Sequence, residues 1–133
     1  MSRIVVATDG PCPGAALRRA ATIAGEDGEV VLAAVVVVPH AMPLEAAPEG
    51  AVAAACAMLD RGERALEGCR ADTRLVRARS FAEGVLGLLA DEHCDALLLQ
   101  VGTGLRNGAR AEVEAILQKA APEVLLVRPA VSP

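Results

Sequence analysis

The chain has 133 residues, of which 53% are apolar and 23% charged, and its formal net charge is −4. This composition is sufficient for one folded domain over residues 1–133 and excludes a disordered chain. A nucleic-acid-binding protein normally carries a basic face, which this acidic balance does not predict. Phe81 is the single aromatic residue, so the core has to be built from Val, Leu, Ile and Ala.

Targeting and redox signals are sparse. The apolar run at residues 4–7 is too short for a signal peptide, and the nine apolar residues 30–38 cannot span a bilayer. We therefore expect a cytoplasmic protein with no membrane partner. The four cysteines form no Cys-x-x-Cys pair, so we expect reduced thiols, with Cys56 buried in a helix. Five of the twelve arginines fall between Arg61 and Arg77, so a local basic patch is an open alternative.

The first half of the chain alternates strands and helices. A β-branched run at residues 4–7 ends at Thr8-Asp9-Gly10-Pro11 and predicts a buried strand followed by a turn. A helix is expected from about residue 13 to 25. Residues 30–38 contain no polar side chain, which predicts a strand covered on both faces.

The next segment combines a long helix with a more exposed strand. A helix is expected over 49–69, with an inner face of Val52, Ala55, Cys56, Leu59 and Leu66. Gly62 should weaken this helix by ~1 kcal/mol relative to Ala. The alternation of charged and apolar residues over 73–79 predicts a strand near a sheet edge. Ser80-x-x-Glu83 is a capping box that begins a third helix, which ends near residue 93.

The sequence of the last part of the chain predicts a strand at 96–101, a glycine-rich loop at 102–108, a helix at 110–120 and a strand at 124–127. Strands that alternate with helices predict an open, five-stranded parallel sheet with helices on both faces, an α/β fold. In such sheets ligands bind at the carboxyl ends of the strands, near the point where the strand order reverses.

Two of the loops at strand ends could carry chemistry. Asp9 is a candidate hydrogen-bond acceptor for a ligand, a candidate metal carboxylate, or a residue that caps its own turn. Gly102-x-Gly104-x-x-x-Gly108 could hold phosphate through backbone N–H groups, although it matches neither Gly-x-Gly-x-x-Gly nor a Walker A loop. A tight structural turn is an equal explanation for these glycines.

An enzymatic alternative rests on Cys12. The spacing from Cys12 to Arg18 is that of cysteine phosphatases, in which a thiolate attacks phosphorus and an arginine holds the phosphate oxygens. Pro13 cannot donate an N–H to such a site, and no Ser or Thr follows Arg18. His40 and His93 have no third ligand at metal spacing. A small α/β enzyme using Cys12 or Asp9 remains an alternative to a non-enzyme.

Three segments make the chain resemble the universal stress protein family. They are Ile4-Val5-Val6-Ala7-Thr8-Asp9-Gly10, Asp95 with the following strand and its Gly102-Thr103-Gly104 turn, and Ala120-Ala121-Pro122-Glu123-Val124-Leu125-Leu126-Val127-Arg128-Pro129. The resemblance implies the strand order 3-2-1-4-5 of the adenine nucleotide alpha hydrolase-like fold. It also implies a homodimer, which we expect through the edge strand Val124–Val127. ATP-binding members place adenosine near the first-strand Asp, here Asp9.

The resemblance also supplies candidate ligand-binding residues. These are Thr8, Asp9, Gly10, Val36, Gly102, Thr103 and Gly104. Family members hold phosphates on a loop Gly-x-x-Gly-x9-Gly-Ser/Thr before the fourth helix. Counting back from Pro122, its final pair falls on Ala111-Glu112, and the loop from Gly102 is shorter than that pattern.

The shorter loop and its Ala111-Glu112 pair determine which function we expect. Glu112 is expected to satisfy the N–H groups at the start of the fourth helix, where a phosphate would lie. We therefore expect a non-catalytic stress-response or regulatory protein that lacks a cofactor and does not bind ATP in the family manner. The alternatives are a member that binds ATP or AMP through an altered loop, and the Cys12 or Asp9 enzyme.

Overall fold

The computed structural model describes residues 2–101 and 109–129. Within them, strands and helices alternate in the predicted order. The elements are β1 (Arg3–Thr8), α1 (Gly14–Ala24), β2 (Glu29–Val37), the 3-10 helix η1 (Leu44–Ala46), α2 (Glu49–Ala65), β3 (Arg70–Ala78), α3 (Phe81–Asp91), β4 (Ala96–Gln100), α4 (Ala109–Lys119) and β5 (Glu123–Val127).

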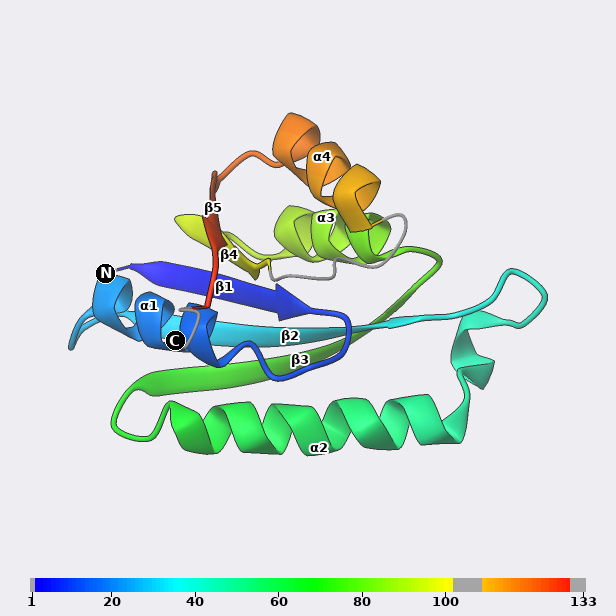
Figure 1. The fold of residues 1–133 in the computed structure, drawn as a ribbon, viewed down its shortest axis with the longest axis horizontal. Helices are drawn as coiled ribbons and strands as arrows, with labels where there is room; N and C mark the ends of the chain where they lie inside the picture. Colours follow the sequence, from blue (N-terminus) through cyan, green and yellow to red (C-terminus); the bar gives the residue numbers. More distant parts are fainter. Residues whose placement is uncertain (1, 102–108, 130–133) are drawn as a thin grey trace.

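The five strands form one parallel sheet in the order β3-β2-β1-β4-β5, as predicted. β1 is central, and its Val5 lies between Val31 of β2 and Leu97 of β4. α1 and α2 cover one face, and α3 and α4 cover the other (Figure 1). The chain builds outward from β1 to β3 and then crosses back to β4, so the strand order reverses between β1 and β4.

The core has one apolar cluster on each face of the sheet. The first contains side chains of α1, α2 and alternate strand positions such as Val6 and Leu32, and the second contains their neighbours Val5 and Val31 with α3 and α4. The continuous apolar run of β2 is buried from Val30 to Val36. This confirms the prediction that both faces of this strand are covered.

Helix α2 differs from its prediction in length and in its inner face. It ends at Ala65, where the Leu66 N–H bonds back to the Gly62 carbonyl, and not near residue 69. The expectation that Cys56 is buried is wrong, because this residue is exposed. Met58 is buried instead. The buried side of α2 is narrow, and Cys56 lies on its flank.

Gly62 has a packing role that its helix propensity does not reveal. A Cβ atom built at this position would overlap Cδ2 of Leu32, a fully buried side chain of β2. The glycine therefore lets α2 approach the sheet closely, and its contribution is not only the weakening expected from the sequence.

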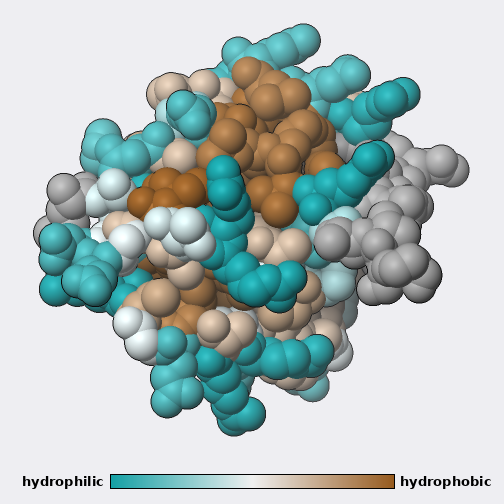
Figure 2. Space-filling model, turned by 60° about the vertical axis from the view of Figure 1, so that its left-hand side comes forward, coloured by the Kyte–Doolittle hydropathy of each residue, from teal (hydrophilic) through white to brown (hydrophobic). Residues whose placement is uncertain are grey.

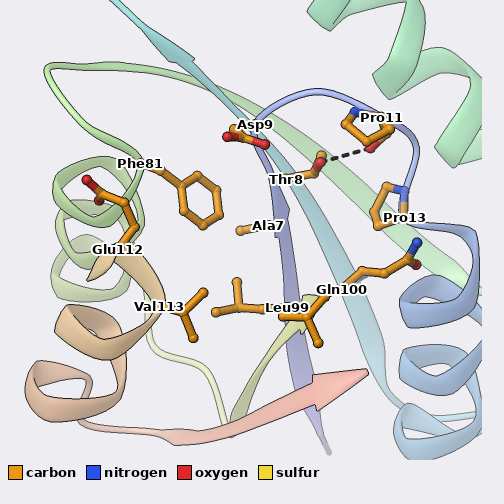
Figure 3. A pocket seen from close by; sticks show the side chains of 11 residues that line it. Ala7, Thr8, Asp9, Pro11, Pro13, Phe81, Leu99, Gln100, Glu112 and Val113 are labelled. Atoms are coloured by element: carbon orange, nitrogen blue, oxygen red, sulfur yellow. Dashed lines mark hydrogen bonds between the residues drawn. The ribbon is translucent and has the colours of Figure 1, made fainter. Parts of the chain in front are cut away.

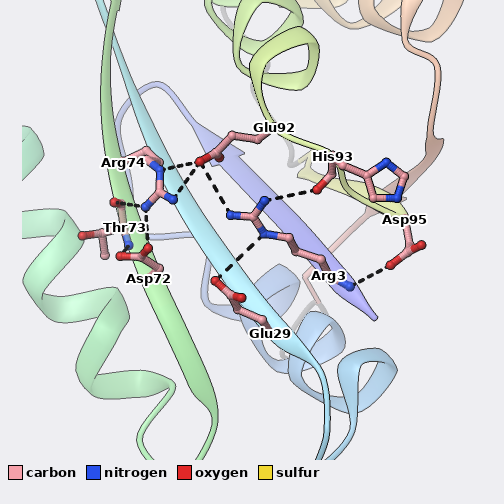
Figure 4. A network of polar contacts seen from close by, with 8 residues as sticks. All are labelled: Arg3, Glu29, Asp72, Thr73, Arg74, Glu92, His93 and Asp95. Atoms are coloured by element: carbon pink, nitrogen blue, oxygen red, sulfur yellow. Dashed lines mark hydrogen bonds and ion pairs between the residues drawn. The ribbon is translucent and has the colours of Figure 1, made fainter. Parts of the chain in front are cut away.

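A polar network joins the amino end of β1 and the middle of β3 to the end of α3 (Figure 4). Arg74 on β3 contacts Glu92 through Nε at 2.8 Å and Nη2 at 2.7 Å, and contacts Asp72 at 2.6 Å. Arg3 lies 3.6 Å from Glu92, and its backbone N–H donates to Asp95 at 2.8 Å. This network is at the end of the sheet opposite the strand termini that carry the candidate site.

The four cysteines and the arginines between residues 61 and 77 were singled out in the sequence, and the structure shows where each group lies. All four cysteines are free, and burial raises the pKa of the Cys94 thiol above its ordinary value. Of the arginines between 61 and 77, Arg74 belongs to the network just described, whereas Arg61, Arg64 and Arg77 are exposed. Within residues 2–101 and 109–129, no helix is long and apolar enough to cross a membrane.

Candidate functional site

The turn after β1 is held by Thr8, which leaves Asp9 exposed. Thr8 is only 8% exposed, and its hydroxyl donates to the Pro11 carbonyl at 2.8 Å and accepts from the Gly10 N–H at 3.3 Å. Asp9 makes no hydrogen bond or ion pair with any residue that the structure describes. Thr8 therefore performs the turn-capping role that was one alternative for Asp9, and no described residue occupies the Asp9 carboxylate.

A small cavity lies beneath Asp9 on the face covered by α3 and α4 (Figure 3). Its volume is about 100 Å³. The residues that line it come from the ends of β1 and β4, the turn before α1, and the first turns of α3 and α4. They are Ala7, Thr8, Asp9, Pro11, Pro13, Phe81, Leu99, Gln100, Val101, Glu112 and Val113. The ring of Phe81 faces the interior of this cavity, and the Asp9 carboxylate lies beside its upper end in this view.

Two helix N-termini beside the cavity are occupied by side chains of the chain itself. Gln100 Oε1 accepts from the backbone N–H of Ala16 in α1 at 3.1 Å. Glu112 Oε2 accepts from the backbone N–H of Ala82 in α3 at 2.7 Å. Free N–H groups at a helix N-terminus are the usual anion site of such folds. At these two positions the acceptor comes from within the protein.

The structure corrects the expectation for Glu112. This carboxylate was expected to satisfy the N–H groups of its own helix, α4, but it reaches across to the first turn of α3. Ser80 caps the same turn by accepting from the Glu83 N–H at 3.1 Å, as the capping box predicts. α3 and α4 pack side by side (Figure 1), so a residue in the first turn of one helix can reach the other.

A second cavity adjoins Asp9 on the opposite face of the sheet. It has a volume of about 300 Å³ and lies between β2 and α2. Asp9 and Gly10 line it together with Val36, so the structure brings together three of the predicted ligand-binding residues. Gly102, Thr103 and Gly104 lie outside the described residues.

The residues of the enzymatic alternative lie at the start of α1 and along it. Cys12 is half-buried and packs against the cluster under α1 and α2. Pro13 is at the N-cap of α1, and Arg18 is exposed on that helix. His40 and His93 are both exposed. No group of three or more potential metal ligands occurs within the part of the chain that the structure describes.

Most of the residues that line this cavity were not among the sequence candidates, and they include Phe81, Gln100 and Val113. Phe81 carried a usable signal, because the only aromatic side chain of the protein directly follows the N-cap Ser80 of α3. Gln100 carried a weaker one, as a polar residue at the end of the apolar strand β4.

Comparison with solved structures shows similarity along nearly the whole chain. The universal stress protein from Archaeoglobus fulgidus in complex with dAMP matches with a TM-score of 0.74 and 16% identity, over 95% of this chain and 97% of that one. An Arabidopsis thaliana universal stress protein family protein with AMP bound matches with a TM-score of 0.71 and 11% identity, over 98% and 94% of the two chains. The fold is that of the universal stress proteins.

A universal stress protein in complex with cAMP also matches, with a TM-score of 0.64 and 19% identity over 97% of this chain and 98% of that one. No protein-family model and no curated protein matches the sequence. At these identities the comparison establishes the universal stress protein fold, with its strand order, and leaves the ligand to be argued from this chain's own residues.

Proposed function

We propose that this protein is a non-catalytic regulatory or stress-response protein of the universal stress type whose Asp9 site does not bind ATP in the family manner. The fold supports the first part of the proposal. The acidic lining of the site supports the second part, because both charged residues among the described cavity walls, Asp9 and Glu112, are carboxylates.

The hydrogen bond from the Ala82 N–H to Glu112 is the observation that carries the proposal. It places a fixed negative charge at the helix terminus that lies beside the cavity. Two like unit charges about 5 Å apart repel by ~1 kcal/mol in water and ~3 kcal/mol at an effective dielectric of 20. A triphosphate carries several such charges, and the described walls supply no Lys or Arg to balance them.

Cavity size supports the same conclusion. Sites for drug-sized ligands usually have volumes of about 300–1,000 Å³. The cavity under α3 and α4 has about 100 Å³, and the one beside Val36 has about 300 Å³. These volumes suit a small ligand better than a nucleoside triphosphate.

Isothermal titration calorimetry with ATP tests the proposal. We expect no binding at physiological ATP concentration by the wild type, nor by the double variant Ala111→Gly/Glu112→Ser, because its loop stays short. ATP binding by the wild type would overturn the proposal. Binding by the double variant alone would show that charge, and not loop length, is the barrier.

A second candidate is a protein that binds AMP or another nucleoside monophosphate through an altered loop. It is favoured by the cavity between Asp9 and Val36, and by the dAMP, AMP and cAMP named in the similar structures. Titration of AMP, cAMP and adenosine separates it from the first. Binding of AMP with an affinity well above that of adenosine would establish a phosphate contact and favour this candidate.

The enzymatic alternative is tested separately. A phosphatase assay with para-nitrophenyl phosphate, run beside Cys12→Ser, is expected to give no turnover with either protein. Turnover that disappears in Cys12→Ser would establish a cysteine phosphatase.

A further inference from the structure

We propose that the cavity beneath Asp9 binds a short primary alkylammonium ion. The ammonium head contacts the Asp9 carboxylate, and the alkyl chain occupies the space between Phe81, Leu99 and Val113. This inference deepens the proposed function, since it names the ligand class of the same site.

The polar groups at the cavity select a hydrogen-bond donor with positive charge. Gln100 Oε1 and Glu112 Oε2 already accept backbone N–H groups, and the Thr8 hydroxyl is committed to Pro11. The Asp9 carboxylate has no partner among the residues that the structure describes. An ammonium ion supplies three N–H donors and the opposite charge.

The local charge favours a cation over a neutral alcohol. The described walls contain two carboxylates and no Lys or Arg, and the chain as a whole carries a net charge of −4. Glu112 points toward the first turn of α3 and not at the Asp9 carboxylate (Figure 3). It therefore adds to the negative potential, and Asp9 alone makes the direct contact.

Apolar walls select an alkyl body. Below Asp9 the side chains of Ala7, Leu99, Phe81 and Val113 surround the cavity (Figure 3). Ala7 and Leu99 are almost fully buried on strands of the central sheet, so these walls are rigid. Each methylene group transferred from water onto such walls strengthens binding about three- to fourfold.

The volume limits the length of the chain. An engineered apolar cavity of about 150 Å³ accommodates benzene, which has six carbons. The present cavity of about 100 Å³ should therefore fill with a chain of about four carbons. Longer chains would extend into solvent and gain little.

Calorimetry at pH 7 with methyl-, propyl-, butyl- and hexylammonium chloride tests the proposal. Affinity is expected to rise about three- to fourfold per methylene up to butylammonium and then level off. The expected dissociation constant of butylammonium is about 1 mM, which so few heavy atoms can supply. Butan-1-ol and butyrate are the matched neutral and anionic probes, and both should bind at least about tenfold more weakly.

Three variants locate the site. Asp9→Asn should weaken butylammonium binding about fivefold or more, because it removes the charge and keeps the shape. Val113→Phe should abolish binding by filling the cavity. Glu114→Gln is the control, since it removes one charge from an exposed position on α4 outside the cavity, and its affinity should match the wild type. Thermal unfolding of each variant verifies that it is folded.

Equal affinity for butylammonium and butan-1-ol, an unchanged affinity in Asp9→Asn, or no heat with butylammonium up to about 20 mM would each overturn the proposal. The ATP titration answers a different question. ATP binding would contradict the proposed function whether or not the amine binds, and failure of the amine alone would leave the proposed function standing.

Discussion

Two glycines of α3, three residues apart, have opposite surroundings. A Cβ atom at Gly84 would lie 2.8 Å from Cγ1 of Val35 and 3.2 Å from Cβ of Ala78, both on the strands beneath the helix. A Cβ atom at Gly87 would have no atom of a described residue within 4 Å. Gly84 therefore sets how closely α3 packs on the sheet. At position 87, packing does not require a glycine.

This difference predicts stability changes of opposite sign. Gly84→Ala should destabilise the protein by about 1–3 kcal/mol, because Val35 is β-branched and cannot easily rotate away. Gly87→Ala should stabilise it by about 0.5–1 kcal/mol through helix propensity alone. Urea denaturation of both variants provides the measurement. Stabilisation by both substitutions would show that the contact at Gly84 relaxes without cost.

Single residues of the site were only partly predictable from the sequence. Asp9 was identified because it ends a buried strand at the switch point, and local sequence carries that information. The partner of Glu112 was not, because its hydrogen bond crosses from α4 to α3 over a separation of 30 residues. The exposure of Cys56 was missed for a related reason. Helical periodicity gives the direction of an inner face but not its width.

At the level of elements, the network around Arg74 ties the exposed strand β3 to α3. β3 is an edge strand with partly exposed side chains, so it gains little from apolar burial. Arg74 bridges Asp72 of the same strand and Glu92 at the end of α3. The Arg74 side chain lowers the pKa of Asp72 mainly by a hydrogen bond, and the Thr73 backbone N–H contributes.

A lowered pKa makes a definite prediction for the pH dependence of stability. Between the native pKa of Asp72 and its ordinary value of 3.8, the unfolded chain binds more protons, so stability rises with pH there. The contribution of Asp72 is fully present above that range and disappears as pH falls through the native pKa. Because this side chain is 54% exposed, Asp72→Asn should cost less than about 1 kcal/mol at pH 7.

Thermal unfolding of Asp72→Asn and the wild type from pH 7 to pH 2 provides the measurement, and the two curves should converge at the acid end. Asp60→Asn, which changes an exposed residue of α2, should track the wild type throughout. A difference for Asp72→Asn that grows toward low pH would contradict the assignment.

Element types and order followed from the sequence because each element has its own local pattern. Continuous apolar runs predicted β2 and β4, and the capping box placed the start of α3 at Ser80, as observed. The end of α2 was misplaced because Leu66 continues the apolar spacing past the last helical turn. A positive φ of 93° at Gly68 completes the reversal into β3, and only the backbone conformation distinguishes this turn from more helix.

At the level of the whole molecule, the strand β5 forms the edge of the sheet opposite β3. Among the described residues it pairs only with β4, and an edge strand presents its outer backbone groups to another strand. Leu126 of β5 and Leu117 of α4 are each 47% exposed. Figure 2 shows apolar side chains gathered into one area on the face it displays, bordered by polar side chains.

We expect β5 to pair with the same strand of a second chain across a two-fold axis, because an apolar edge is an aggregation hazard unless it is used. Light scattering at tens of micromolar protein should give a mass twice that of the 13.6 kDa chain. Leu126→Lys should shift the mass toward the monomer by placing two like charges across the axis. Val37→Lys is the matched control, because Val37 is equally exposed but lies on β2, and it should remain a dimer. A monomeric wild type would contradict the prediction, and loss of the dimer in both variants would place the interface elsewhere.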